Sequence, residues 1–245
     1  MNPRHAPGAA KIVLVYQSLL GIYGDQGNSR VLAKRLQWRG IDAEVVTVEP
    51  GDPLPADGVV YLLGGGEDNA QTTAVRELRK DGALFSAIAD GAVVFAVCAG
   101  YQICGRSFTI GETDQVREGL GLLDVETRRG PQRAVGEILT HWTKPDGSDY
   151  LISGFENHGG HTTLGPDAAP LARVEVGVGN CGDGTEGAVQ GRVIGTYPHG
   201  PVLARNPDLA DHVLELALGR PLEPLERAQG AHAGLRRERT AFVRR

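Results

Sequence analysis

Residues 92–102, AVVFAVCAGYQ, decide the fold that the sequence predicts. A run of apolar, strand-forming residues stops at Cys98 and then continues through small residues into a stretch that suits a helix. A buried strand that turns sharply into a helix forms a nucleophile elbow, in which the turn residue projects from the carboxyl edge of a sheet. Cys98 would then lie at a helix N-terminus, where unpaired N–H groups and the helix dipole favour the thiolate.

The elbow departs from its ideal pattern at one position. An ideal elbow has the pattern G-x-C-x-G, and Ala96 stands in place of the first glycine. Alanine is still small enough for a tight turn. The alternative is that Cys98 is a buried small apolar residue at the end of a strand, as free cysteines often are.

Composition limits the classes of protein to which the chain can belong. Of 245 residues, 41% are hydrophobic and 22% are charged, which is typical of a soluble globular protein. The net charge of -5 and the lack of a basic stripe argue against a nucleic acid partner. We expect a disordered lead-in at 1–10, one domain at 11–219 and a charged tail at 220–245, which is either solvated or docks a partner.

The sequence predicts a cytoplasmic protein. No apolar run is as long as a membrane span, and residues 1–8 lack the apolar core of a signal peptide. Cys98, Cys104 and Cys181 form neither a CxxC pair nor an even disulfide framework, which fits a reducing compartment. We expect Cys104 to pack in the core.

The two halves of the chain have different patterns. In the first half, buried strands alternate with helices, which predicts a parallel sheet with helices on both faces. In the second half, short strands joined by turns predict hairpins that continue this sheet antiparallel, before a last helix at 207–218. The first-half strands are expected at 11–16, 44–48, 59–63 and 92–98, and those of the second half at 121–126, 133–140, 151–155, 171–178, 187–190 and 193–197.

A cysteine nucleophile needs a base, and His199 is the leading candidate. It directly follows a predicted strand, within the backbone-restricted segment YPHGP at 197–201. His158 and His161 also follow a strand, into a glycine loop, but two histidines without a third ligand predict no metal site. The remaining histidines are expected at the surface; they are His5, His141, His212 and His232.

The oxyanion hole is expected from backbone N–H groups. Ala99 follows the nucleophile, and Gly64 and Gly65 belong to a glycine run after the third strand. Both places lie at carboxyl ends of neighbouring strands, where open α/β sheets carry their sites.

Nucleotide-binding motifs are lacking. The segment GVGNCG at 177–182 matches G-x-G-x-x-G, but a turn follows it instead of a helix, so we expect a hairpin loop. No GxxxxGK[ST] loop occurs. In an ATP-driven reaction, another chain would have to bind the nucleotide.

The order of these motifs resembles that of class I glutamine amidotransferases. The glycine loop, the cysteine elbow followed by AGYQ at 99–102, and the late strand ending in His199 carry the resemblance. Segments 154–160 (GFENHGG) and 197–201 resemble the branch that includes cobyric acid synthase. Over 11–219 the chain is most similar to GatD-type glutaminase subunits, which work with the Mur ligase-like MurT.

The resemblance implies an α/β fold of three layers, with a central, mostly parallel sheet, an antiparallel extension and flanking helices. It also implies that the chain hydrolyses L-glutamine through a Cys98 thioester, with His199 as acid and base. The ammonia would pass to a MurT-like partner, which handles lipid II at the cytoplasmic membrane face and amidates its D-glutamate α-carboxylate. ATP and Mg are expected on that partner, and no cofactor in this chain.

Two further residues are implied as substrate contacts. Arg133 precedes the segment AVGEI and matches an arginine of GatD-type proteins, so it is expected to bind the glutamine α-carboxylate bidentately. A surface salt bridge is the alternative role for this arginine. Gln102, in the first turn of the helix after Cys98, is expected to contact the amino-acid head of the substrate.

One position departs from the family pattern. Many class I members carry a glutamate two residues after the histidine, and this chain has Pro201 there. The site is therefore either a Cys98 and His199 dyad or receives a carboxylate from elsewhere, with the partner chain as one source. A carboxylate from the partner would couple glutamine hydrolysis to assembly.

Other functions remain open at this level. The chain could supply ammonia to another acceptor, such as a corrinoid or nucleotide precursor, because the synthetase determines the acceptor. It could also be a non-catalytic binding module on the same fold, or a cysteine hydrolase such as a peptidase. Copurification of a Mur ligase-like chain would identify the acceptor, activity would exclude the binding module, and a preference for free glutamine over peptide amides would exclude the peptidase.

Overall fold

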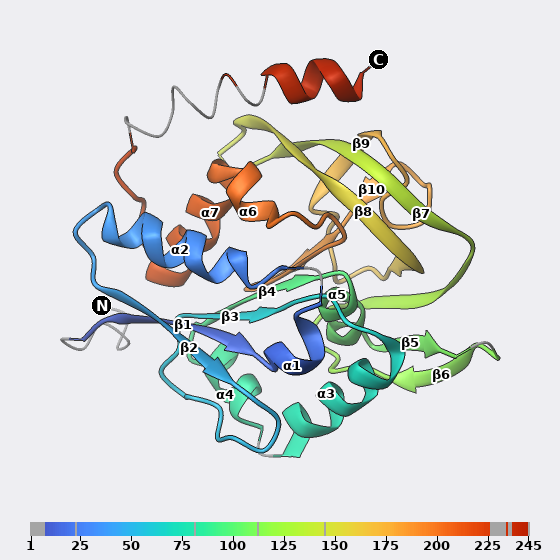
Figure 1. Ribbon diagram of the computed structural model, residues 1–245, viewed down its shortest axis with the longest axis horizontal. Helices are drawn as coiled ribbons and strands as arrows, with labels where there is room; N and C mark the ends of the chain where they lie inside the picture. The colour runs from blue at the N-terminus through green and yellow to red at the C-terminus, as the bar shows by residue number, and fades with distance from the viewer. Residues whose placement is uncertain are drawn as a thin grey trace.

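The computed structural model describes residues 8–22, 24–80, 82–111, 113–144, 146–225, 234 and 237–244. Its centre is a six-stranded sheet with the order β11-β12-β4-β3-β1-β2 (Figure 1). All neighbours in this sheet are parallel except β11 and β12. Its strands are β1 (Ala10–Val15), β2 (Ala43–Val48), β3 (Val60–Leu63), β4 (Val93–Val97), β11 (Ala188–Gln190) and β12 (Val193–Thr196).

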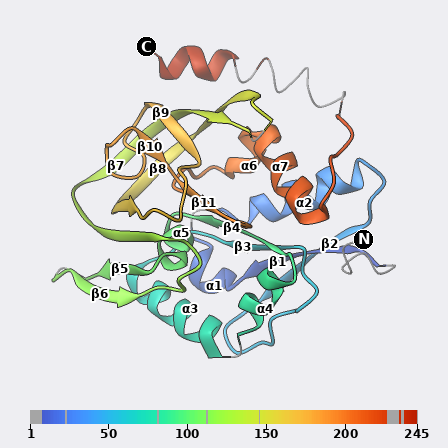
Figure 2. The ribbon, with the colours of Figure 1, turned by 180° about the vertical axis from the view of Figure 1, so that it is seen from behind.

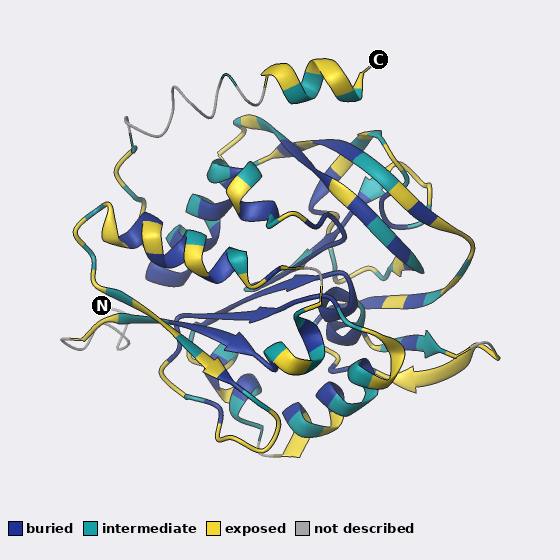
Figure 3. Cartoon of the chain, in the orientation of Figure 1, coloured by how far each residue is buried: buried dark blue, intermediate teal, exposed yellow. Residues whose placement is uncertain are grey.

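Helices cover both faces of the central sheet, as a parallel sheet requires. In Figures 1 and 2, α2, α6 and α7 lie on one face, and α1, α3 and α4 lie on the other. Every residue of β3, β4 and β12 is buried between them (Figure 3). The helices are α1 (Gln17–Leu20), α2 (Gly27–Gln37), α3 (Asp68–Lys80), α4 (Ala83–Ala89), α5 (Ala99–Cys104), α6 (Val202–Arg205) and α7 (Pro207–Leu218).

A second sheet stands beside the first. It has the order β10-β9-β7-β5-β6, and β8 pairs with β7. The α/β class is confirmed, but the prediction that the second-half strands continue the central sheet is wrong for most of them. The strands of this sheet are β5 (Ser107–Ile110), β6 (Gln115–Glu118), β7 (Val125–Thr143), β8 (Asp149–Leu164), β9 (Ala172–Val176) and β10 (Thr185–Glu186).

The burial pattern explains which strands join which sheet. β7 and β9 mix buried with exposed residues, which suits an antiparallel sheet with one solvated face. β12 is buried throughout, so it pairs parallel with β4 in the core. Only the short β11 extends the central sheet antiparallel.

The β7–β8 hairpin is longer than its sequence suggested. His158 and His161, expected in a glycine loop, lie within β8. Glycine is permitted in this strand because another group approaches its backbone closely. A Cβ atom at Gly160 would lie 2.4 Å from Nε2 of Gln102.

Other predicted elements are confirmed. The last helix spans Pro207–Leu218, with a proline in its first turn. The glycine segment 177–182 connects β9 to β10, which are antiparallel, so it is a hairpin loop and not a dinucleotide site. Cys104 is fully buried.

Parts of both predicted ends lie outside the described residues. Residues 1–7 of the lead-in are not described, and β1 already begins at Ala10. The tail is described at 220–225, 234 and 237–244, where Arg244 forms an ion pair with Glu175 of β9. Within the described ranges, no helix is long and apolar enough to cross a membrane.

Candidate active site

Cys98 occupies the turn between β4 and α5, as predicted. Its backbone has φ 51° and ψ −107°, a strained conformation for a residue other than glycine. The turn is held because the Cys98 N–H donates to the carbonyl of Thr196 on β12 at 2.9 Å. Gly100 then lets the helix approach β3, since a Cβ atom there would lie 2.4 Å from the Leu63 carbonyl oxygen. This strand, turn and helix form the predicted elbow.

His199 follows β12, the neighbour of β4, and lies beside the Cys98 thiol. Its Nδ1–H donates to the carboxylate of Asp25, with Nδ1 3.1 Å from Oδ2 and 3.3 Å from Oδ1. Burial lowers the pKa of this imidazole, but hydrogen bonds to Asp25 and Cys98 and the charges of both groups outweigh burial and raise the pKa to about 10. His199 is therefore an imidazolium at neutral pH.

Sequence reasoning missed Asp25. This residue lies in the loop between α1 and α2 and is only 3% exposed. It supplies the carboxylate that Pro201 does not, and it comes from this chain and not from a partner. The first residue of α2, directly after this loop, packs closely against Pro201, because a Cβ atom at Gly27 would lie 2.1 Å from the Pro201 Cγ. An acid in a glycine-flanked loop after the first strand was the available signal.

The glycine loop after β3 serves two purposes. The Gly65 N–H donates to Asp25 Oδ2 at 3.0 Å, so this group is engaged with Asp25 and not with the thiol. The Gly64 carbonyl accepts the Gly100 N–H at 3.0 Å, which joins the loop to the helix after Cys98. Gly66 lines the same cavity as Cys98. Gly65 was predicted as an oxyanion donor, but in the structure its N–H donates to Asp25.

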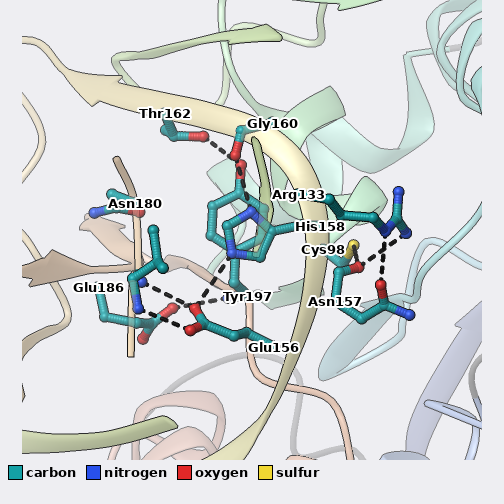
Figure 4. Close-up of polar contacts among 12 residues, drawn as sticks. Cys98, Arg133, Glu156, Asn157, His158, Gly160, Thr162, Asn180, Glu186 and Tyr197 are labelled. Atoms are coloured by element: carbon teal, nitrogen blue, oxygen red, sulfur yellow. Dashed lines mark hydrogen bonds and ion pairs between the residues drawn. The ribbon is translucent and has the colours of Figure 1, made fainter. Parts of the chain in front are cut away.

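A cavity of about 500 Å³ opens next to Cys98, and Arg133 and Gln102 both line it. Arg133 Nε donates to Asn157 Oδ1 at 2.8 Å, and Nη2 donates to the Asn157 carbonyl at 3.3 Å (Figure 4). Among the described residues, Arg133 forms no salt bridge. The guanidinium thus lines the cavity without a carboxylate partner among the residues that the structure describes.

Gln102 is held on two sides. Its Oε1 accepts from Gln71 Nε2 at 2.6 Å, and its Nε2 donates to the Tyr197 hydroxyl at 3.4 Å. Gln71 lines the cavity as well. The predicted substrate residues Arg133 and Gln102 thus lie in one cavity with Cys98, although they come from the β7–β8 sheet and from α5.

Of the other histidines, His5 and His232, expected at the surface, lie outside the described residues, and His158 lines the cavity beside Cys98. His141 is exposed and contacts Glu175, whereas His212, predicted at the surface, is half-buried against Trp142. His158 and His161 occur with no third ligand nearby, since no group of three or more His, Cys, Asp or Glu side chains could hold a metal among the described residues.

A strained cysteine at an elbow, a carboxylate-bound histidine on the next strand and an adjoining glycine loop define a cysteine-dependent α/β enzyme of the glutamine amidotransferase type. The chain belongs to the CobB/CobQ-like glutamine amidotransferase family, whose model matches residues 11–207. The resemblance inferred from the motifs is thereby confirmed, and the chain is a glutamine amidotransferase.

Curated relatives support the same family. The chain is 36% identical over 215 residues to the GatD subunit of lipid II isoglutaminyl synthase from Staphylococcus aureus (strain N315), covering 84% of this chain and 85% of that protein. It is 32% identical to the GatD subunit from Streptococcus pneumoniae (strain R6), with 86% and 82% covered. The Brucella canis cobyric acid synthase is 40% identical over 169 residues, but these span only 32% of its length.

Solved structures support the fold. A crystal structure of a glutamine amidotransferase matches with a TM-score of 0.56 and 24% identity, over 84% of this chain and 98% of that chain. The structure of PurLQS from Thermotoga maritima matches with a TM-score of 0.57 and 16% identity, over 86% and 99%. At these identities the likeness concerns the α/β architecture alone.

Proposed function

We propose that this chain is the glutaminase subunit of a two-chain lipid II isoglutaminyl synthase. The GatD relatives, similar over most of their length, support the assignment to this synthase. The observation that carries the glutaminase role is the placement of the Asp25-bound His199 beside Cys98, which lines a cavity. The chain hydrolyses L-glutamine to glutamate and ammonia, and the ammonia is passed to a partner.

In the first step, the Cys98 thiolate attacks the side-chain amide carbon of glutamine. The N–H groups of Ala99 and Gly66 stabilise the negative oxygen that forms, since Ala99 begins α5 and Gly66 lines the cavity. The His199 imidazolium then gives its proton to the departing nitrogen. The C–N bond breaks, ammonia leaves and a glutamyl thioester remains on Cys98.

In the second step, His199 has become neutral and acts as the base. It takes a proton from a water molecule, which attacks the thioester carbon. The C–S bond breaks, glutamate is released and the thiolate and imidazolium are restored. Asp25 stabilises the imidazolium and fixes Nδ1 as the donor throughout.

The cavity selects the amino-acid head of the substrate. Arg133 binds the α-carboxylate with its planar guanidinium, which matches a carboxylate better than an ammonium does. Gln102 contacts the same head from α5, and the acidic residues Glu67 and Asp68 also line the cavity. The pocket thus combines both signs of charge, as a zwitterionic substrate requires.

The partner in this proposal is a MurT-like Mur ligase synthetase. This chain has no phosphate-binding loop in its sequence, so ATP and Mg bind to the partner. The partner activates the D-glutamate α-carboxylate of lipid II, and ammonia from Cys98 converts it to the amide. We place the reaction on the cytoplasmic face of the membrane, where ATP is available.

The test is glutamate release from L-glutamine by the purified chain, with and without a coexpressed MurT-like chain. We expect glutamate from the complex, and amidation of lipid II when ATP and Mg are added. A complex that releases glutamate but amidates no lipid II would contradict the assignment of the acceptor. A folded complex that releases no glutamate would contradict the glutaminase and favour a binding module.

Replacing Arg133 with lysine should weaken substrate binding more than it slows chemistry. Lysine keeps the charge but loses the two parallel donors, so we expect KM for glutamine to rise roughly 10-fold or more and kcat to change by less than about 3-fold. Steady-state kinetics measure both constants. Arg117→Lys, on the exposed strand β6, is the matched control and should leave KM unchanged.

A further inference from the structure

A buried histidine that the proposed chemistry does not use lines the cavity. His158 on β8 is 2% exposed. Its Nδ1 lies 2.9 Å from the Gly160 carbonyl oxygen, and its Nε2 lies 3.4 Å from Oε2 of Glu156 (Figure 4). Carbonyl and carboxylate oxygens accept hydrogen bonds, so both ring nitrogens must carry hydrogen to donate to them. Both ring nitrogens of His158 thus face acceptors, an arrangement that suits an imidazolium.

Glu156 has the contacts of an ionised carboxylate. It is 2% exposed, and its Oε1 accepts from the Val178 N–H at 2.7 Å. Its Oε2 accepts from the Gly179 N–H at 3.0 Å. Backbone donors stabilise the charged form of a carboxyl group. A protonated His158 would form a buried ion pair with Glu156, and removing one partner of such a pair would leave the other charge uncompensated.

The ring of His158 also supports Tyr197. The two rings stack with their centroids 3.6 Å apart and their planes at 13°. A cation over the face of an aromatic ring is attracted by it. The Tyr197 hydroxyl in turn shares a hydrogen bond with Thr162 Oγ1 at 2.6 Å and accepts one from Gln102. Through this stack, His158 fixes the group that orients Gln102.

The segment that follows Glu156 supports Arg133. Asn157 accepts both hydrogen bonds of the guanidinium, through its side chain and its carbonyl. The same carbonyl lies 4.0 Å from the Cys98 sulfur. A Cβ atom at Gly159 would lie 3.8 Å from Arg133 Nη1, so the arginine extends across this backbone. The His158 ring holds the same segment in place through its contacts with the Glu156 carboxylate and the Gly160 carbonyl.

We propose that His158, as the imidazolium of a buried pair with Glu156, is a positioning residue that sets Arg133 and Gln102 for the amino-acid head of glutamine. The inference rests on the proposed glutaminase function. His158 reaches Arg133 through Asn157 and Gln102 through Tyr197. Loss of the pair should therefore disturb recognition of the substrate head more than the reactivity of Cys98.

Three variants test this inference. Glu156→Gln and His158→Gln each remove one charge, and the double variant removes both. We expect KM for glutamine to rise roughly 10- to 100-fold in each single variant, as for loss of a charged hydrogen bond, while kcat changes by less than about 3-fold. The double variant should raise KM by much less than the product of the single effects, because no unpaired charge is left.

Alkylation of Cys98 by iodoacetamide separates positioning from general damage. This reagent lacks an amino-acid head, so its rate of reaction should stay within about 2-fold of wild type in every variant. The matched control is Glu186→Gln, which changes another fully buried glutamate that contacts Thr196 and the Tyr197 N–H. Burial raises the pKa of Glu186 to about 7, so an uncharged amide suits its site. Its KM should be unchanged.

The outcomes are distinguishable. An unchanged KM in both single variants would overturn the inference. So would a parallel loss of kcat, KM and alkylation with a lowered melting temperature, because that pattern indicates structural damage alone. Wild-type glutamate release tests the proposed function separately. Nitrogen NMR tests the pair without turnover: both ring N–H groups of His158 should be visible in wild type, and a single one would overturn the imidazolium.

Discussion

Replacement of Cys98 with alanine is expected to lower the rate of glutamate release at least about 10⁴-fold, to a level near the background, since loss of a nucleophile removes the covalent route. The elbow leaves no substitute for this thiol. Cys104, six residues along the chain, is fully buried, and burial raises its pKa to about 12. Glutamate release by the purified complex, followed over hours, is the measurement.

The control for this experiment is Cys181→Ser. Cys181 is the third free cysteine, half-buried in the loop between β9 and β10, and burial and Asp183 raise its pKa. Its replacement should leave glutamate release unchanged. The Cys98→Ala variant should still bind glutamine and its partner, because alanine fits the turn. Residual activity within about 10-fold of wild type would show that Cys98 is not the nucleophile.

The sequence predicted the parts of the site that depend on neighbouring residues. The elbow at Cys98 follows from an apolar run and the small residues after it, and His199 follows from a buried strand into a restricted turn. These patterns are local, so both elements lie where they were expected. The long β7–β8 hairpin was harder to predict, because Gly159 and Gly160 weaken a strand pattern, and Gly160 is explained only by the close approach of Gln102 to its backbone.

The pairing of Asp25 with His199 could not be predicted from either residue. The two positions are 174 residues apart and meet only because the loop after α1 folds over the carboxyl end of the sheet. The role of Gly65 follows from the same approach, since its N–H donates to Asp25. A motif at one end of a chain gives no information about which loop reaches it, so position 201 was the wrong place to look for a carboxylate.

Replacement of Asp25 with asparagine is expected to lower kcat about 10²- to 10⁴-fold, as loss of the carboxylate does in other triads. An asparagine amide is nearly the same size but cannot stabilise the imidazolium, and its NH₂ group opposes the Nδ1–H of His199. Asp57→Asn is the control, because Asp57 is an exposed acid that pairs with Lys11. It should leave kcat unchanged.

The pH dependence gives this prediction a second readout. Burial lowers the pKa of His199, but hydrogen bonds and charges from Asp25 and Cys98 raise it to about 10. A raised pKa stabilises the fold fully below the unfolded pKa of about 6.5, and this contribution is lost as the pH rises through about 10. Asp25→Asn should therefore lower the melting temperature most near pH 6.5, and by progressively less as the pH rises through about 10.

The rate profile should move in the same direction. Without Asp25, His199 loses its proton at a lower pH, so the alkaline limb of kcat/KM shifts towards neutral. This shift distinguishes a carboxylate that acts on His199 from one that only holds the loop. If Asp25→Asn lowered kcat with an unchanged alkaline limb, Asp25 would act through Gly65 and the glycine loop alone. If kcat were unchanged, the site would work as a dyad of Cys98 and His199.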